Sequence, residues 1–177
     1  YSEDGVLTGK LASQVVMGAR TKGLYTYVKH FAINNQESQR MGVFTWANEQ
    51  CMREQYFIPY EICVKEGKAT GVMTAFNRIG ATWAFGDYDL ITGVLRGEWG
   101  FVGSVVTDCL WAAEYVNGDA MIRAGGSLAL SNVATISYNV GTPTTVSLLR
   151  RSAKDVLYLH ANSMAINEGD YPTTPKK

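Results

Sequence analysis

Three segments of the chain place apolar residues four positions apart, which is the spacing of an amphipathic helix. The expected helices cover residues 7–21, 46–66 and 144–167. Their expected core positions are Leu11, Val15 and Ala19 in the first, Met52, Tyr56, Tyr60 and Val64 in the second, and Leu148, Val156, Leu159 and Met164 in the third. Pro59 should kink or divide the second helix, because proline lacks the amide hydrogen that an interior turn uses.

Short apolar runs between these helices predict buried strands. They cover residues 24–32, 71–76, 103–107 and 127–130, and residues 136–140 have strand propensity without a helix before them. The alternation of strands and helices predicts an α/β fold with about four parallel βα units. In such sheets, polar residues at the carboxyl ends of strands are where ligands bind.

Two shorter helices complete the alternation. Asp87 is expected to cap a helix over residues 90–95, and residues 110–124 read as mostly helical with a break at residues 117–118. Residues 77–86 between these elements have the composition of a loop.

Composition and charge narrow the class of protein. Hydrophobic residues make up 46% and charged residues 18% of 177 residues, which is typical of one globular domain. Sixteen basic side chains balance sixteen acidic ones, so there is no electrostatic reason to expect a nucleic acid or a membrane as partner. No apolar run approaches the roughly 20 residues that a membrane helix needs.

The cysteines point to no metal and no cofactor. Cys51, Cys63 and Cys109 are odd in number and lack metal-ligand spacing, so we expect free thiols. No leader is visible after Tyr1; either one was removed or the chain begins inside a larger protein. Free thiols slightly favour a reducing compartment such as the cytoplasm.

Four residues that could carry chemistry lie at the ends of expected strands or in the loop that follows. Asp108 ends the strand over 103–107, where a carboxylate costs free energy unless it is hydrogen-bonded, paired or used. Position alone fits a loop cap and a nucleophile or general base equally well. Lys29 and His30 reach one ligand only if the backbone turns, because neighbouring strand residues point to opposite faces. With Arg40 they could donate hydrogen bonds to a polyhydroxylated ligand or an anion.

Other constellations are weaker. His160 lies within an apolar helix and is expected to be structural, and no further ligands assemble a zinc site. No nucleophile-elbow motif supplies a serine, and no glycine spacing matches a phosphate loop, so a small α/β phosphate binder is a remote alternative.

Five blocks in order resemble glycoside hydrolase family 3, the β-glucosidase and β-xylosidase family. The blocks are YSED at residues 1–4, KHFAINNQESQR at 29–40, GVMTAFNRIG at 71–80, GVLRGEWGFVGSVVTDC at 93–109 and MIRAGGSLALS at 121–131. Residues 153–169 resemble the end of those members whose α/β domain precedes the barrel domain. The resemblance covers most of the chain.

The resemblance implies both a fold and an activity. The fold would be a partial (β/α)8 TIM-type barrel, a half-barrel domain over residues 1–169, followed by a polar tail at 170–177. The activity would be hydrolysis of terminal non-reducing β-D-glucosyl residues with retention of configuration. Asp108 matches the family nucleophile.

The same resemblance assigns the substrate contacts. Lys29, His30 and Arg40 match residues that bind sugar hydroxyls in the subsite preceding the scissile bond. The expected partners are a β-glucoside or oligosaccharide substrate and, because about four βα units leave sheet edges open, a second copy of the chain or a companion domain.

Three departures from the family pattern leave an alternative open. Cys109 stands where a Trp or Tyr is usual, and Ser127 replaces the usual Asp of the AG-x-DL segment. No block matches the general acid, which in the family comes from a second domain or an inserted loop. The alternative is a non-catalytic sugar-binding or structural fragment of a family 3 glycosidase.

Overall fold

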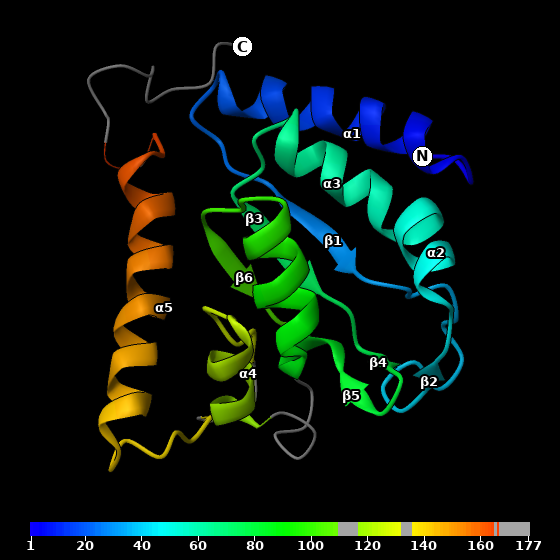
Figure 1. The fold of residues 1–177 in the computed structure, drawn as a ribbon. Coiled ribbons are helices and arrows are strands. Elements are labelled where there is room, and N and C mark those ends of the chain that lie inside the picture. Colours follow the sequence, from blue (N-terminus) through cyan, green and yellow to red (C-terminus); the bar gives the residue numbers. More distant parts are fainter. Residues whose placement is uncertain (110–116, 132–135, 165, 167–177) are drawn as a thin grey trace.

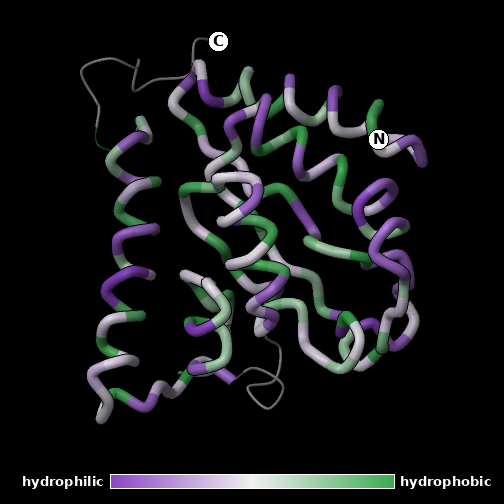
Figure 2. Tube along the Cα trace, in the orientation of Figure 1, coloured by the Kyte–Doolittle hydropathy of each residue, from purple (hydrophilic) through white to green (hydrophobic). Residues whose placement is uncertain are grey.

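A computed structural model describes residues 1–109, 117–131, 136–164 and 166. Its centre is a three-stranded parallel sheet in the order β1-β3-β6, with helices packed around it (Figure 1). The strands are β1 (Tyr27–Phe31), β3 (Gly71–Thr74) and β6 (Ser104–Val106). Each lies inside a run that the sequence predicts, and the apolar residues of the central strands form the buried middle of the molecule (Figure 2).

The expected fourth strand is reduced to one parallel bridge between Val106 and Leu128. The Ser127 hydroxyl accepts a hydrogen bond from the Val105 amide at 3.2 Å, where a regular ladder would use a backbone carbonyl. Residues 136–140 form no strand either. The described residues therefore form a mixed α/β fold with a parallel sheet, in which three strands and a bridge replace the expected four strands.

The first helix, α1 (Gly5–Arg20), forms as expected but buries a different face. Leu11 and Val15, expected in the core, are 46% and 53% exposed. The buried face contains Gly9 and Val16 instead. The apolar spacing therefore predicts the helix correctly, but it assigns the wrong face of the helix to the core.

Close packing between helices explains this inversion. A Cβ atom at Gly9 would lie 2.8 Å from Ile62 Cδ1 and one at Gly5 would lie 2.6 Å from Ile58 Cγ2, both too close. Because glycine has no side chain, α1 approaches its neighbour more closely through this face than a leucine face would allow. The small residues therefore select the buried side of α1.

The expected long helix is divided into three consecutive parts: α2 (Glu49–Cys51), the π-helical η1 (Met52–Phe57) and α3 (Ile58–Lys65). It begins later than residue 46, because the Asn48 side chain caps α2 by accepting from the Cys51 amide at 2.8 Å. Pro59 lies in the first turn of α3, where its missing amide hydrogen costs nothing. The expected division near Pro59 is therefore confirmed.

The four apolar positions expected on that helix all contact the main core. Phe31 of β1 is fully buried against the rings of Phe57, Tyr60 and Trp99, with ring-centre distances of 5.6, 5.0 and 5.6 Å. Tilted aromatic pairs of this kind add to the stabilisation from burial alone. This cluster holds β1 against the helix that covers it.

Three further helices are η3 (Asp89–Glu98), α4 (Gly118–Ala124) and α5 (Pro143–Ala161). Asp87 Oδ1 accepts from the Leu90 amide at 3.0 Å, so its expected capping role is confirmed. Asn117 caps α4, so a helix begins at the position where the break is expected. Residues 110–116 and the tail at 170–177 lie outside the described residues. His160 on α5 is exposed, so its side chain lies outside the core.

A second small sheet was not expected. It has the order β2-β4-β5, with β2 (Phe44–Thr45) parallel to β4 (Arg78–Ile79) and β4 antiparallel to β5 (Thr82–Trp83). Gly80, at a φ of 58°, begins the turn between β4 and β5. The short helix η2 (Ala84–Gly86) follows β5. Strands of two residues are too short to show a hydrophobic period. The sequence therefore predicts a loop over residues 77–86, which contain β4 and β5.

Three further findings apply to the described residues. None of their helices is long and apolar enough to span a membrane. No group of three or more His, Cys, Asp or Glu side chains among them could hold a metal ion. The thiols of Cys51, Cys63 and Cys109 are free.

Candidate active site

His30 and Asp108 meet at the carboxyl end of the parallel sheet. His30 belongs to β1 and Asp108 follows β6, so their side chains approach each other over the intervening strand β3. His30 Nε2 lies 3.2 Å from Asp108 Oδ2. The sequence placed both residues at strand ends, and the structure brings these two together.

The Asp108 carboxylate is buried but incompletely satisfied. The residue is 9% exposed, and Oδ1 accepts a hydrogen bond from the Cys109 amide at 2.7 Å. Oδ2 accepts no hydrogen bond among the described residues, although His30 Nε2 lies 3.2 Å away. A buried carboxylate oxygen left in this way is costly to the fold and available to another group.

The environment of His30 favours its neutral form. Burial lowers the pKa of His30 below its ordinary value of 6.5, and the negative charge of Asp108 opposes this shift. The positive charges of Lys29 and Arg40 lower the pKa further. At neutral pH the ring therefore acts as a neutral hydrogen-bonding group.

Two residues that the sequence did not mark for the site hold the β1 end in place. The Tyr60 hydroxyl donates to the His30 carbonyl at 2.6 Å, and Asn77 Nδ2 donates to the Ala32 carbonyl at 3.1 Å. Burial raises the pKa of Tyr60, so its hydroxyl stays protonated and can donate. The sequence predicts Tyr60 only as a core position of its helix, and it places Asn77 in a segment with the composition of a loop.

Lys29 and Arg40 lie near His30 without a described contact to Asp108. Lys29 is exposed, and the Lys29–His30 peptide bond is cis. Arg40 Nη1 pairs with Glu37 Oε2 at 3.0 Å, and its guanidinium lies 4.6 Å from the centre of the Phe76 ring. Both charges are close enough to influence the pKa of His30. The site thus has a buried pair with two cations beside it.

A cleft of about 770 Å³ opens beside His30. It lies between the start of α1, the loop after β1 and the α2–α3 helix, and Lys29, His30, Asn34 and Tyr60 contribute to its wall. Asp108 does not line it, so the cleft reaches the histidine side of the pair. A ring-sized polar ligand has room there.

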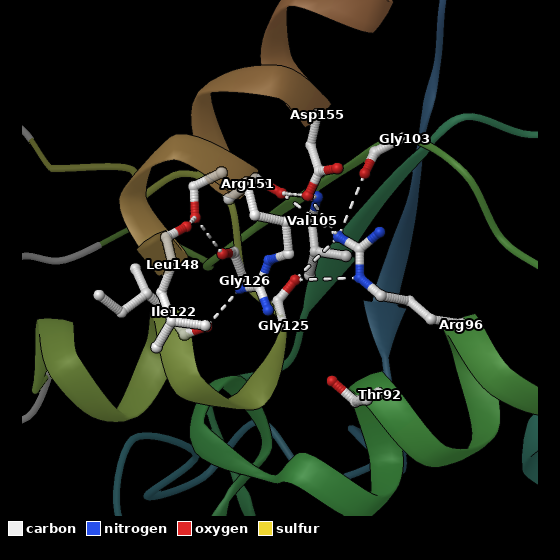
Figure 3. A network of polar contacts seen from close by, with 12 residues as sticks. Thr92, Arg96, Gly103, Val105, Ile122, Gly125, Gly126, Leu148, Arg151 and Asp155 are labelled. Atoms are coloured by element: carbon white, nitrogen blue, oxygen red, sulfur yellow. Dashed lines mark hydrogen bonds and ion pairs between the residues drawn. The ribbon is translucent and has the colours of Figure 1, made fainter. Parts of the chain in front are cut away.

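An ionic contact between two largely buried side chains lies at the amino end of β6 (Figure 3). Arg96 Nη2 donates to Asp155 Oδ2 at 2.9 Å, to the Gly125 carbonyl at 2.8 Å and to the Gly103 carbonyl at 3.2 Å. The Ser127 hydroxyl also donates to Asp155 Oδ2 at 2.9 Å. These bonds attach α5 to the sheet, away from His30 and Asp108.

Comparison with known sequences identifies related enzymes. Residues 1–137 match the Glycosyl hydrolase family 3 N terminal domain. The chain is 38% identical over 130 residues to a probable beta-glucosidase I of Aspergillus flavus, covering 73% of this chain and 15% of that protein. It is 40% identical over 130 residues to an exo-alpha-(1->6)-L-arabinopyranosidase of Bifidobacterium breve, covering 73% of this chain and 17% of that protein.

Solved structures agree with these sequence matches. Beta-glucosidase 3B of Thermotoga neapolitana, solved in complex with alpha-D-glucose, has a TM-score of 0.86 at 30% identity, covering 99% of this chain and 26% of that one. A beta-glucosidase of Paenibacillus barengoltzii has a TM-score of 0.83 at 36% identity, covering 94% and 20%. The chain thus spans a quarter or less of most of these relatives. It belongs to glycosyl hydrolase family 3, and residues 1–137 correspond to the N-terminal domain of that family.

Proposed function

We propose that the chain supplies the nucleophile and part of the sugar subsite for retaining hydrolysis of terminal non-reducing β-D-glucosyl residues. The observation that carries this proposal is Asp108 Oδ2, a buried carboxylate oxygen without a hydrogen-bond partner among the described residues, beside His30 at the carboxyl end of the sheet. This is the edge at which barrel enzymes place their catalytic groups.

In the proposed reaction, Asp108 attacks the anomeric carbon and forms a glycosyl–enzyme bond as the bond to the leaving oxygen breaks. Water then hydrolyses this bond and restores the configuration. A second carboxyl roughly 5 Å from the nucleophile must protonate the leaving oxygen. The family resemblance assigns that acid to a second domain or an inserted loop, and none is assigned within this chain.

The neighbours of Asp108 would bind the sugar that is transferred. Neutral His30 can exchange hydrogen bonds with a hydroxyl, and the cationic groups of Lys29 and Arg40 can donate to others. Arg40 would first have to turn from Glu37, its partner in the free chain. Hydrogen bonds that strengthen as positive charge develops on the ring would lower the activation barrier.

We also propose that the sheet forms part of an eight-stranded barrel completed by a companion domain or a second copy. On α1 the side chains of Leu7, Leu11 and Val15 are 46–53% exposed, and a groove of about 290 Å³ runs between this helix and β1. Apolar stripes of this size beside an edge strand favour association. Light scattering tests this: a monomer at high concentration would contradict association between copies.

Replacement of the nucleophile tests the catalytic proposal. Asp108→Asn should lower kcat/KM for an aryl β-glucoside about 10⁴-fold, as loss of a covalent nucleophile does elsewhere. Asp89→Asn, which changes an exposed carboxylate on η3, is the matched control and should keep full activity. Undiminished hydrolysis by Asp108→Asn would overturn the assignment. An aryl α-L-arabinopyranoside run in parallel distinguishes the two sugars named among the relatives.

The second candidate function is sugar binding without turnover. Cys109 in place of the family's aromatic residue and the unassigned general acid favour it. Titration calorimetry with glucose, run beside the activity assay, separates the two functions. Binding of glucose without any hydrolysis of the aryl glucoside would support this second candidate.

A further inference from the structure

The small β2-β4-β5 sheet carries an exposed aromatic surface made of Phe44, Trp46, Arg78 and Trp83. Trp46 is 77% exposed and Phe44 is 51% exposed. The Arg78 guanidinium lies between two rings, 4.4 Å from the centre of Phe44 and 3.8 Å from that of Trp83. A contiguous exposed aromatic patch with a polar rim is typical of a binding site.

The backbone around Trp46 holds this surface in place. Trp46 directly follows β2, which pairs in parallel with β4, and the Gly80 amide donates to the Thr45 carbonyl at 2.9 Å. A Cβ atom at Gly80 would lie 3.5 Å from Trp46 Cζ3, so the indole rests on the turn. One face of the turn therefore supports the indole, and most of the side chain remains open to a ligand.

One buried side chain connects the backbone that carries this surface to the backbone beside the candidate active site. Asn77, which is fully buried, donates both to the Ala32 carbonyl and to the Thr45 hydroxyl. Ala32 lies two residues after His30, and Thr45 lies directly before Trp46. The loops that build both regions leave the same edge of the parallel sheet, after β1 and after β3.

The chemistry of the surface selects a sugar ring. A pyranose has an apolar C–H face that packs on an indole and equatorial hydroxyls that accept from a guanidinium. Arg78 Nη1 donates to the Gly42 carbonyl, and the described residues include no carboxylate paired with Arg78. The other N–H groups of the Arg78 guanidinium can therefore donate hydrogen bonds to a ligand.

We propose that Trp46 and Arg78 form a binding subsite for the leaving-group sugar of an oligosaccharide. The proposal rests on the function proposed above, because the transferred sugar would occupy the subsite beside Asp108. Trp46 would contribute to the affinity for a second ring and to the discrimination between oligosaccharides and small glucosides. It would not contribute to bond cleavage itself.

Titration calorimetry in an Asp108→Asn background tests this subsite without hydrolysis of the ligand. With cellotriose as the probe, adding Trp46→Ala should weaken binding about tenfold. Binding of methyl β-D-glucoside, which has one ring, should change by less than about twofold. Trp46→Phe should restore most of the cellotriose affinity, and Tyr158→Ala, an exposed aromatic residue on α5, should leave it unchanged.

Three results would overturn the proposal. They are unchanged cellotriose affinity in Trp46→Ala, an equal loss for the trisaccharide and the monosaccharide, and no cellotriose binding at all by the Asp108→Asn chain. A change from dimer to monomer in Trp46→Ala with unaltered sugar affinity would identify a second copy as the occupant instead. The catalytic proposal fails by a different result, undiminished hydrolysis in Asp108→Asn alone.

Discussion

Strand β6 has a largely buried carboxylate at each end, and the two carboxylates differ in how fully their oxygens are satisfied. At the amino end, Asp155 Oδ2 accepts from both Arg96 and Ser127, and Arg96 also donates to two carbonyls. At the carboxyl end, Asp108 Oδ2 accepts no hydrogen bond among the described residues, and His30 Nε2 lies 3.2 Å from it. The first carboxylate oxygen is fully engaged in hydrogen bonds, whereas the second can still accept one.

The surroundings of the two ends explain this difference. Helix α5 and the turn at Gly125 and Gly126 close over the amino end, where Ser152 also donates to the Gly126 carbonyl at 3.0 Å. The carboxyl end adjoins the cleft beside His30. Buried charges are tolerated where neighbours satisfy them, and an unsatisfied one persists where a ligand is expected to do so.

The largest expected difference between the two ends is the loss of stability when the carboxylate of each is removed. Asp155→Ala leaves the Arg96 guanidinium buried without its counter-ion and should lower the free energy of unfolding by about 3–5 kcal/mol. Asp108→Asn removes a charge that has few partners, so we expect a change of at most about 1 kcal/mol. Urea denaturation measures both changes. Equal losses would show that the two carboxylates contribute equally to stability and would contradict the comparison.

Exchanging the serine and the aspartate at positions 127 and 155 tests whether Asp155 takes the place of the family's carboxylate at position 127. Ser127 stands where the family resemblance places an Asp, and its hydroxyl lies 2.9 Å from the Asp155 carboxylate. Ser127→Asp alone should be destabilising because two carboxylates would then meet near one arginine. Adding Asp155→Ser should recover about 1–3 kcal/mol of that loss as a coupling energy. Additive losses in a double-mutant cycle would show that Asp155 does not replace the missing carboxylate.

The titration of His30 examines the carboxyl end. Its pKa lies below 6.5, and Asp108→Asn should lower it further, because the charge of Asp108 opposes the effect of burial. NMR can follow the ring proton in both forms, with exposed His160 as the internal control. A raised pKa in Asp108→Asn would contradict the electrostatic description of the pair.

The same shift predicts how stability depends on pH. Because the folded pKa of His30 lies below the unfolded one, the folded chain binds fewer protons between the two values. The contribution of neutral His30 to stability is therefore fully present above about pH 6.5 and falls as the pH drops through the folded pKa. Asp108→Asn should steepen this loss on the acid side.

The smallest expected effect concerns the anchor behind His30. Tyr60→Phe removes the hydrogen bond to the His30 carbonyl while keeping the ring that packs on Phe31, so stability should fall by about 1 kcal/mol. Tyr158→Phe, on the exposed side of α5, is the control and should be neutral. Thermal denaturation measures both. If the two variants are equally stable, the hydroxyl does not anchor β1.

Local signals in the sequence were sufficient for much of the fold. Pro59 correctly marked the division of one helix, and Asp87 correctly marked the cap of another, η3. Three apolar runs correctly marked the three strands of the parallel sheet. These features depend on neighbouring residues along the chain, which a sequence shows directly. For the site, the position of Asp108 and His30 at strand ends was accessible in the same way.

Features that depend on distant contacts were not predictable. The buried face of α1 was decided by how closely Gly9 approaches Ile62, and the link of Asp155 to Ser127 joins residues 28 positions apart. The small sheet under Trp46 pairs two-residue strands from separate loops. None of these leaves a period in the sequence.

The amino-acid sequence by itself determined the alternation of strands and helices, the family blocks, and the presence of Asp108, His30, Lys29 and Arg40 at strand ends or in the loop that follows. Only the tertiary structure decided which of them meet, because contact between β1 and β6 depends on the packing of β3 between them. Periodicity is a property of consecutive residues, whereas the satisfaction of a buried charge depends on every neighbour in space.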